Sequence, residues 1–245
     1  MPKSKPEKNI SRFSEDTSEF GGYVYTSTSQ LSSKLANEHI TEITLTLANL
    51  QGKSIFDIGC GDGTYTLELF KKGRPKNILG IDPVAVAVKA AKERNNDSRI
   101  SFCVGNIYSL PKNKKYDLAV VRGVLHHLYQ PEKALKEIAG VANEVLIIEP
   151  NGYNPVLKII EKISKYHVEH EEKSYPPHTL DRWIKKSGGL IRRRKFGGFV
   201  PFFCPDWLAR CLKFFEPLAE SLPLLNRFIC GNYYIMYDLP VIKLK

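Results

Sequence analysis

The chain has 245 residues, of which 42% are hydrophobic and 25% charged, and its formal net charge at pH 7 is +10. This length fits one α/β domain with appendages and excludes two full domains, and no run approaches the roughly 20 apolar residues that a membrane-spanning helix needs. The five cysteines are scattered without metal-ligand spacing, which indicates reduced thiols and a cytoplasmic protein. The N-terminal lysines precede no apolar stretch, so we expect no signal peptide.

The positive charge attracts polyanions and anionic surfaces. Nucleic acid, anionic lipid and an anionic substrate all fit it, and some of the lysines serve only solubility. The charge by itself therefore selects none of these partners.

The first fifty residues predict a polar arm followed by a helix. Residues 1–18 are polar, and we expect them to be flexible. Residues 28–50 carry apolar side chains at roughly helical spacing, and Gly52 ends the predicted helix. The apolar positions are Leu31, Leu35, Ile40, Ile43, Leu47 and Leu50.

Strands and helices then alternate as far as residue 149. The strands are nearly unbroken Ile, Leu and Val, as expected where helices cover both faces of a sheet. This alternation predicts an α/β fold with a doubly wound parallel sheet. The expected strands are 54–58, 77–81, 100–104, 116–121 and 144–149, and the expected helices are 62–72, 84–94 and 131–142.

The pattern changes after residue 150. Residues 151–177 form a polar insert that contains a helix, and 199–230 form an apolar, aromatic insert with four prolines. A helix over 179–187, a strand over 190–196 and a final strand over 231–239 complete the chain. Because loops after strand carboxyl ends line the pocket of a doubly wound sheet, we predict that both inserts cap it.

A glycine-rich turn follows the first strand. Gly59, Gly61 and Gly63 alternate behind Asp57, and such a turn presents backbone N–H groups closely to a ligand. The dinucleotide fingerprint would place its third glycine at position 64, where this chain has Thr64. The spacing therefore departs from the NAD pattern.

This turn resembles motif I of the class I S-adenosylmethionine-dependent methyltransferases, in particular the type 11 and type 12 groups, and the resemblance covers about residues 53–150. It implies a Rossmann-like seven-stranded sheet with the last strand antiparallel, and S-adenosylmethionine as cofactor. It also implies that Asp82 binds the two ribose hydroxyls and that Asn106, in place of the usual acid, accepts the adenine amino group. The remaining cofactor-binding residues that it implies are Asp57, Gly59, Gly61, Gly63, Pro83, Ile107 and Arg122.

Each of these assignments has a structural alternative. The glycines could serve only the turn, Asp82 could cap the following helix, and Asn106 could be a turn residue. Tyr25, in the N-terminal arm, could reach the cofactor carboxylate as tyrosines do in related enzymes, or it could be a surface aromatic.

Two adjacent histidines follow the fourth predicted strand. His126 or His127 could take the proton of a hydroxyl nucleophile, because a histidine titrates near neutral pH. We expect one ring to face the pocket and the other to pack away, with His126 the better candidate base. Packing or cofactor shaping is the alternative for both.

A second histidine cluster invites a metal interpretation. His167, His170 and Glu171 lie close in sequence, with His178 nearby, but their spacing matches no strong zinc pattern. Methyl transfer from a sulfonium needs no metal. We therefore predict no metal site and a solvated helix face.

The predicted organisation is an arm and lid helix over 1–50 and a methyltransferase domain over 51–245, with cap inserts at 151–177 and 199–230. The aromatic insert favours a small apolar or aromatic acceptor, with O-methylation preferred. Its aromatic side chains could instead fill a small core of the insert itself, and both can hold if one face lines a pocket. A helix near 207–215 with basic residues at its edge leaves open a lipid-linked acceptor and peripheral membrane contact.

We do not expect a nucleic-acid substrate. The fourth strand lacks the pattern of enzymes that methylate exocyclic amines of bases, and no RNA-binding module is appended. Two alternatives stay open: an RNA methyltransferase, and a methyltransferase-like binding protein with a degenerate site. The sequence does not assign an oligomeric state.

Overall fold

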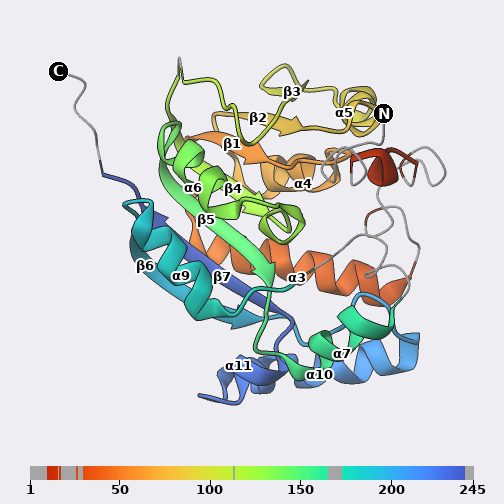
Figure 1. Ribbon diagram of the computed structural model, residues 1–245. Helices are drawn as coiled ribbons and strands as arrows, with labels where there is room; N and C mark the ends of the chain where they lie inside the picture. The colour runs from red at the N-terminus through yellow and green to blue at the C-terminus, as the bar shows by residue number, and fades with distance from the viewer. Residues whose placement is uncertain are drawn as a thin grey trace, which may run out of the picture.

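A computed structural model describes residues 10–15, 17, 26, 30–112, 114–164 and 173–240 (Figure 1). Its centre is a seven-stranded sheet with the order β3-β2-β1-β4-β5-β7-β6. The first five strands are parallel, and β7 is antiparallel to both of its neighbours. The predicted Rossmann-like, doubly wound sheet with an antiparallel last strand is confirmed. The strands are β1 (Ser54–Ile58), β2 (Asn77–Asp82), β3 (Ile100–Val104), β4 (Tyr116–Arg122), β5 (Ala142–Pro150), β6 (Leu190–Gly197) and β7 (Asn232–Asp238).

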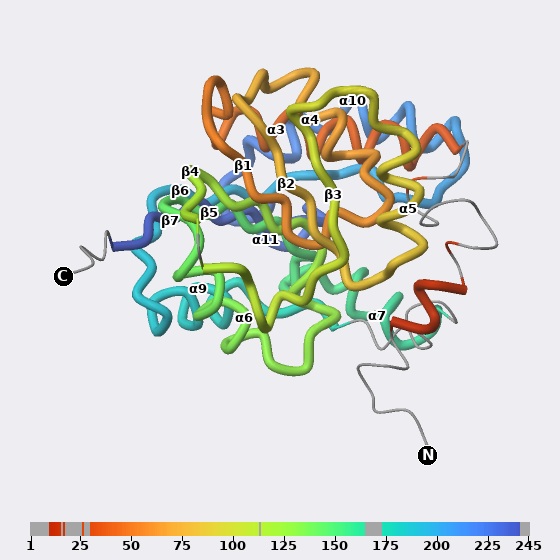
Figure 2. Tube along the Cα trace, turned by 90° about the horizontal axis from the view of Figure 1, so that it is seen from above, coloured from red at the N-terminus to blue at the C-terminus, as the bar shows by residue number. Residues whose placement is uncertain are grey.

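Helices cover both faces of the sheet. Alternate residues of β1 show why: Phe56 and Ile58 pack toward α6 and α9, whereas Ile55 packs toward α3, α4 and α5. Figure 2 shows the sheet between these two layers. The helices are α3 (Leu31–Leu47), α4 (Thr64–Gly73), α5 (Ala85–Arg94), α6 (Pro131–Ala139) and α9 (Pro177–Lys186).

Helix α6 ends earlier than the sequence predicted. It stops at Ala139, with Gly140 as its C-cap, and β5 begins at Ala142. The reason is tertiary: Ala142 is the register partner of Tyr116, and the Tyr116 N–H donates to the Val141 carbonyl at 2.8 Å. Pairing with β4 therefore places Ala142 in a strand, although local periodicity predicts a helix there.

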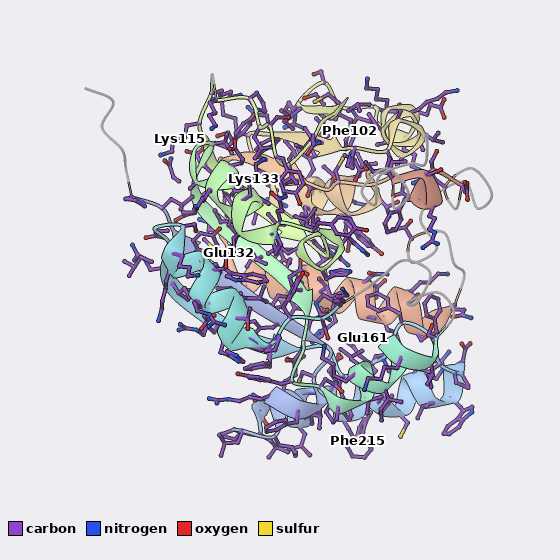
Figure 3. The ribbon with its side chains drawn as sticks, viewed as in Figure 1. Phe102, Lys115, Glu132, Lys133, Glu161 and Phe215 are labelled. Carbon is purple, nitrogen blue, oxygen red and sulfur yellow. The ribbon has the colours of Figure 1, made fainter. Side chains whose placement is uncertain are left out.

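The two inserts lie together beyond the carboxyl end of β5. They contain α7 (Pro155–Ile163), α10 (Asp206–Ser221) and α11 (Asn226–Ile229). The Asn151 side chain donates to the Cys230 carbonyl at 2.9 Å and so joins them. Many apolar side chains of α10 face solvent, for example Trp207 (71% exposed) and Phe214 (79%), and Phe215 lies at the rim in Figure 3. These side chains do not fill a core of the insert.

Within the part of the chain that the structure describes, no helix combines the length and the apolarity that crossing a bilayer requires.

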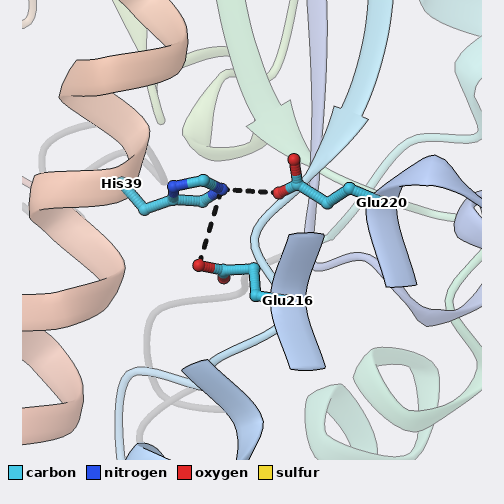
Figure 4. Close-up of side chains that lie close together, drawn as sticks. All are labelled: His39, Glu216 and Glu220. Atoms are coloured by element: carbon cyan, nitrogen blue, oxygen red, sulfur yellow. Dashed lines mark hydrogen bonds and ion pairs between the residues drawn. The ribbon is translucent and has the colours of Figure 1, made fainter. Parts of the chain in front are cut away.

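A network around His39 fixes α10 to α3 (Figure 4). The Nε2 atom of His39 lies 2.6 Å from Oε1 of Glu220 and 3.6 Å from Oε2 of Glu216. Glu216 and Glu220 also pair with Lys213 at 2.7 Å and Lys195 at 2.9 Å. The three residues could in principle hold a metal ion, but lysines already engage both carboxylates. We therefore interpret the cluster as an ion-pair network.

This network should make stability depend on pH at both ends of the range. Burial lowers the pKa of His39, but the hydrogen bond to Glu220 and the charges of Glu216 and Glu220 outweigh it and hold the pKa above 6.5. The stabilisation is thus complete below pH 6.5 and is lost as pH rises through the raised pKa. Burial raises the pKa of Glu220, but its hydrogen bonds lower it to about 2, so its contribution is present above pH 4.5 and is lost toward pH 2.

Chemical denaturation of the wild type and His39→Gln between pH 5 and pH 9 (about the range in which histidine changes charge) checks the alkaline half of this prediction. The difference in the free energy of unfolding should shrink as pH rises above 6.5. A difference that is constant across this range would show that the charge of His39 does not stabilise the fold.

Candidate cofactor and active site

The turn between β1 and α4 needs glycine at three positions. Gly59, Gly61 and Gly63 have φ values of 81°, 55° and 77°, in the left-handed region that favours glycine. A Cβ on Gly59 would lie 2.3 Å from Cγ2 of Val124, and one on Gly63 would lie 2.8 Å from the Cβ of Ala91. The turn is therefore tightly packed from behind, and its backbone can be approached closely by a ligand. This geometry fits the glycine role that the sequence predicted.

Gly59→Ala should destabilise the protein by about 2 kcal/mol or more, because it combines a positive φ with a clash against the stiff, β-branched Val124. Gly52→Ala is the matched control, since Gly52 has φ 71° but nothing within 4 Å of the added Cβ. The control should lose only about 1–2 kcal/mol from the backbone. Equal losses in the two variants, measured by chemical denaturation, would show that packing against Val124 is unimportant.

Asp82 ends β2 and is 5% exposed. Its Oδ2 accepts the Gly61 N–H at 3.0 Å, and its Oδ1 accepts the Val84 N–H at 2.9 Å. The carboxylate thus ties the glycine turn to Val84, the N-cap residue of α5. The binding of the two ribose hydroxyls by this carboxylate stays a prediction.

Asp57 and Arg122 brace the helices around the turn. Asp57 is buried and accepts the Thr66 hydroxyl at 2.5 Å. Burial raises the pKa of Asp57 to about 6, against the opposing effects of Thr66 and Arg122. The Arg122 guanidinium lies 3.7 Å from the Tyr65 ring centre and donates to Oδ1 of Asn37 at 2.7 Å. Both side chains already have protein partners, so their direct contact with cofactor remains an untested prediction.

Four further predicted cofactor residues differ in placement. The side-chain oxygen of Asn106 accepts the Tyr108 N–H at 2.9 Å, which favours the turn-residue alternative. Ile107 is buried in the core beside α6, and Pro83 is exposed. Tyr25 lies outside the described residues.

Glu149 orients His126. Glu149, at the end of β5, is 1% exposed, and its Oε2 lies 2.8 Å from Nδ1 of His126. It also accepts the backbone N–H groups of Val124, Leu125 and His126 at 2.8–3.1 Å. An ionised carboxylate can only accept, so Nδ1 carries the proton and Nε2 is the acceptor nitrogen. Glu149 was not among the predicted site residues, because its contact with His126 joins two positions that are 23 residues apart.

Residues of the N-terminal segment contact His127 and the glycine turn. The ring centres of His126 and His127 are 3.8 Å apart, and Phe13 packs edge-on against His127 at 5.0 Å. The Thr26 hydroxyl donates to Oδ2 of Asp62, within the glycine turn, at 2.6 Å. Described residues of the N-terminal arm thus contact both halves of the site.

The predicted solvated histidine cluster is not placed by the structure. His167, His170 and Glu171 lie outside the described residues. His178 is exposed, and its Nδ1 lies 2.8 Å from the Tyr153 hydroxyl. Nothing in the geometry of His178 indicates a metal ligand.

The sheet topology and the glycine turn define a class I methyltransferase. A family model described as a methyltransferase domain matches residues 49–188, more than half of the chain. The chain therefore belongs to this methyltransferase family, and it is an enzyme whose cofactor is S-adenosylmethionine. The binding of that cofactor by Gly59, Gly61, Gly63 and Asp82 stays a prediction.

Curated relatives match only part of the chain. The tRNA U34 carboxymethyltransferase of Campylobacter fetus is 33% identical over 99 residues, which are 39% of this chain and 35% of that enzyme. The enzyme of the same name from Haemophilus influenzae is 28% identical over 153 residues, 58% of this chain and 46% of that enzyme. The chain thus spans less than half the length of these relatives.

Solved structures agree over most of the chain. A Haloferax volcanii methyltransferase, solved in complex with the Trm112 activator, has a TM-score of 0.65 at 16% identity, covering 93% of this chain and 97% of that one. Magnesium protoporphyrin IX methyltransferase from Synechocystis, with bound S-adenosylhomocysteine, has a TM-score of 0.60 at 14% identity, covering 87% and 89%. At these identities the likeness shows the fold.

The prediction about partners was wrong. We expected a small-molecule or lipid-linked acceptor rather than nucleic acid and left peripheral membrane contact open, yet the relatives that match part of this chain are named for tRNA. The missing strand-end pattern excludes only chemistry on exocyclic amines. It has no bearing on hydroxyl or ring acceptors in RNA, and the net charge of +10 is compatible with a polyanionic substrate.

Proposed function

We propose that this enzyme methylates RNA, with transfer RNA as the substrate class, in the cytoplasm. The observation that carries the proposal is the 28–33% identity of its core to tRNA U34 carboxymethyltransferases. The net charge of +10 supports it, because a basic protein gains affinity for phosphate backbones by releasing their counterions.

We further propose how the chain holds its donor. The amides of the turn 59–63 and the carboxylate of Asp82 bind S-adenosylmethionine, which when bound supplies a methyl group already activated by its sulfonium. Asp57 and Arg122 keep α3 and α4 in place around the turn. The protein therefore contributes mainly positioning and exclusion of water, which are the main requirements of an in-line displacement.

His126 is the base in this proposal, and the acceptor is a hydroxyl. Glu149 holds the proton on Nδ1, and Nε2 takes the hydroxyl proton as the acceptor oxygen attacks. The carboxylate also stabilises the imidazolium that this transfer creates. Because Glu149 holds the loop 124–126 as well, base and loop are positioned by a single buried group.

A methyl-transfer screen tests the proposal. The enzyme is incubated with methyl-labelled S-adenosylmethionine and, in parallel, with unfractionated tRNA, ribosomal RNA, phenols and quinones. Label should enter tRNA faster than any other acceptor. Label that enters only phenols or quinones would overturn the RNA assignment while leaving the methyltransferase assignment intact.

A further inference from the structure

A basic groove lies at the edge of the sheet opposite the glycine turn. It has a volume of about 530 Å³ and is formed where β2, β3 and β4 begin. Its cations are Lys76, Arg99 and Lys114, and Ser98 and Ser101 add hydroxyl groups. Lysine, arginine and serine donors are the groups with which proteins bind nucleic-acid phosphates.

Aromatic rings position two of these cations. The Arg99 guanidinium lies 4.6 Å from the Phe70 ring centre, and the Lys114 ammonium lies 5.0 Å from the Tyr116 ring centre. Asp97 holds Arg99 through two hydrogen bonds, of 3.0 Å and 2.6 Å, and its negative charge offsets the positive charge of the guanidinium. Lys76 and Lys114 therefore supply most of the attraction for an anion.

The groove is part of a wider basic edge. Lys115, labelled in Figure 3, is exposed beside Lys114 immediately before β4. Arg74 is also exposed, two residues before Lys76. A phosphate backbone that crosses this edge would meet several cations in succession.

The groove and the cofactor turn are one strand length apart. Strand β1 has five residues and joins the two edges, which corresponds to about 17 Å at 3.3–3.4 Å per residue. A nucleic-acid duplex presents one phosphate charge per about 1.7 Å of its axis, or on the order of ten charges over this distance. A folded RNA is large enough to contact both edges, whereas a small acceptor is not.

We propose that this groove is a second RNA-binding surface, where Lys76, Arg99 and Lys114 bind backbone phosphates while another part of the same RNA occupies the catalytic edge. The proposal rests on the proposed RNA methyltransferase function. Phosphate contacts of this kind add affinity and orient the RNA without reading its sequence.

The test is a double charge reversal, Lys76→Glu with Lys114→Glu. Its binding to unfractionated tRNA should weaken on the order of tenfold, and the slope of log affinity against log salt should fall by about two. S-adenosylmethionine affinity and unfolding temperature should not change, because both lysines are exposed. The matched control is Lys185→Glu with Lys186→Glu on α9, which makes the same change in net charge and should weaken tRNA binding much less.

The outcomes separate the two proposals. Wild-type protein that methylates tRNA, with the groove variant binding tRNA as tightly and with the same salt slope, would overturn the groove alone. An equal loss in the groove and α9 variants would also overturn it, because net charge would then explain the effect. Wild-type protein that neither binds nor methylates tRNA would overturn the proposed function and the groove together.

Discussion

His126→Asn should lower kcat by about 100- to 1,000-fold, since general-base catalysis contributes on the order of 10²–10⁴. In the wild type, the rate should fall on the acid side of the pH profile as the imidazole becomes protonated. This acid limb should disappear in the variant, whereas the affinity for S-adenosylmethionine should change little. Initial rates on tRNA across the pH range measure all three effects.

The control for this variant is His178→Asn, which replaces an exposed histidine on α9. It should retain the wild-type pH profile. If His126→Asn keeps wild-type kcat, the imidazole is a packing group and the base assignment fails. The unfolding temperature of both variants must be measured, because His126 is 8% exposed and helps to bind Glu149.

Asp82→Ala should weaken S-adenosylmethionine binding about ten- to a hundredfold, the effect of losing a charge-assisted interaction worth about 1.5–3 kcal/mol. The variant loses the proposed bonds to the ribose and also the bond that holds the Gly61 N–H. Isothermal titration calorimetry gives the affinity, and Asp97→Ala, at the far edge of the sheet, is the control. Unchanged affinity in a folded Asp82→Ala protein would contradict the assignment of Asp82.

The parallel strands could be predicted from sequence because both of their faces are buried. The apolar runs 54–58 and 100–104 correspond to β1 and β3 with the same bounds. The apolar residues that indicate each of these strands lie within the strand itself. The end of α6 could not be predicted in this way, because Ala142 joins β5 through its pairing with Tyr116.

The site residues likewise differ in whether their roles depend on local sequence or on distant contacts. The glycine turn could be predicted because positive φ and close packing demand glycine at those positions. The role of Glu149 could not, since it depends on a contact with His126 across 23 residues. The His39–Glu220 pair spans 181 residues and left no local pattern at all. The side chain of Asn106 accepts a bond within its own turn, and its predicted contact with adenine stays a prediction.

The aromatic insert shows where composition misleads. Its phenylalanines and tryptophan suggested a small core, an acceptor cap or an interfacial helix, and the exposure of Trp207 and Phe214 argues against the core. Composition gives the number of apolar side chains in a helix. The face of α10 that packs inward is set by its contacts with α3, including the buried Glu216.

The central claim is that RNA receives the methyl group. After incubation with the enzyme and methyl-labelled S-adenosylmethionine, tRNA can be digested to nucleosides and separated by chromatography with mass spectrometry. We expect one nucleoside to gain the mass of a labelled methyl group with wild-type enzyme, and we expect this gain to be nearly absent with His126→Asn. Unlabelled nucleosides from a preparation that does methylate a phenol or a quinone would contradict it.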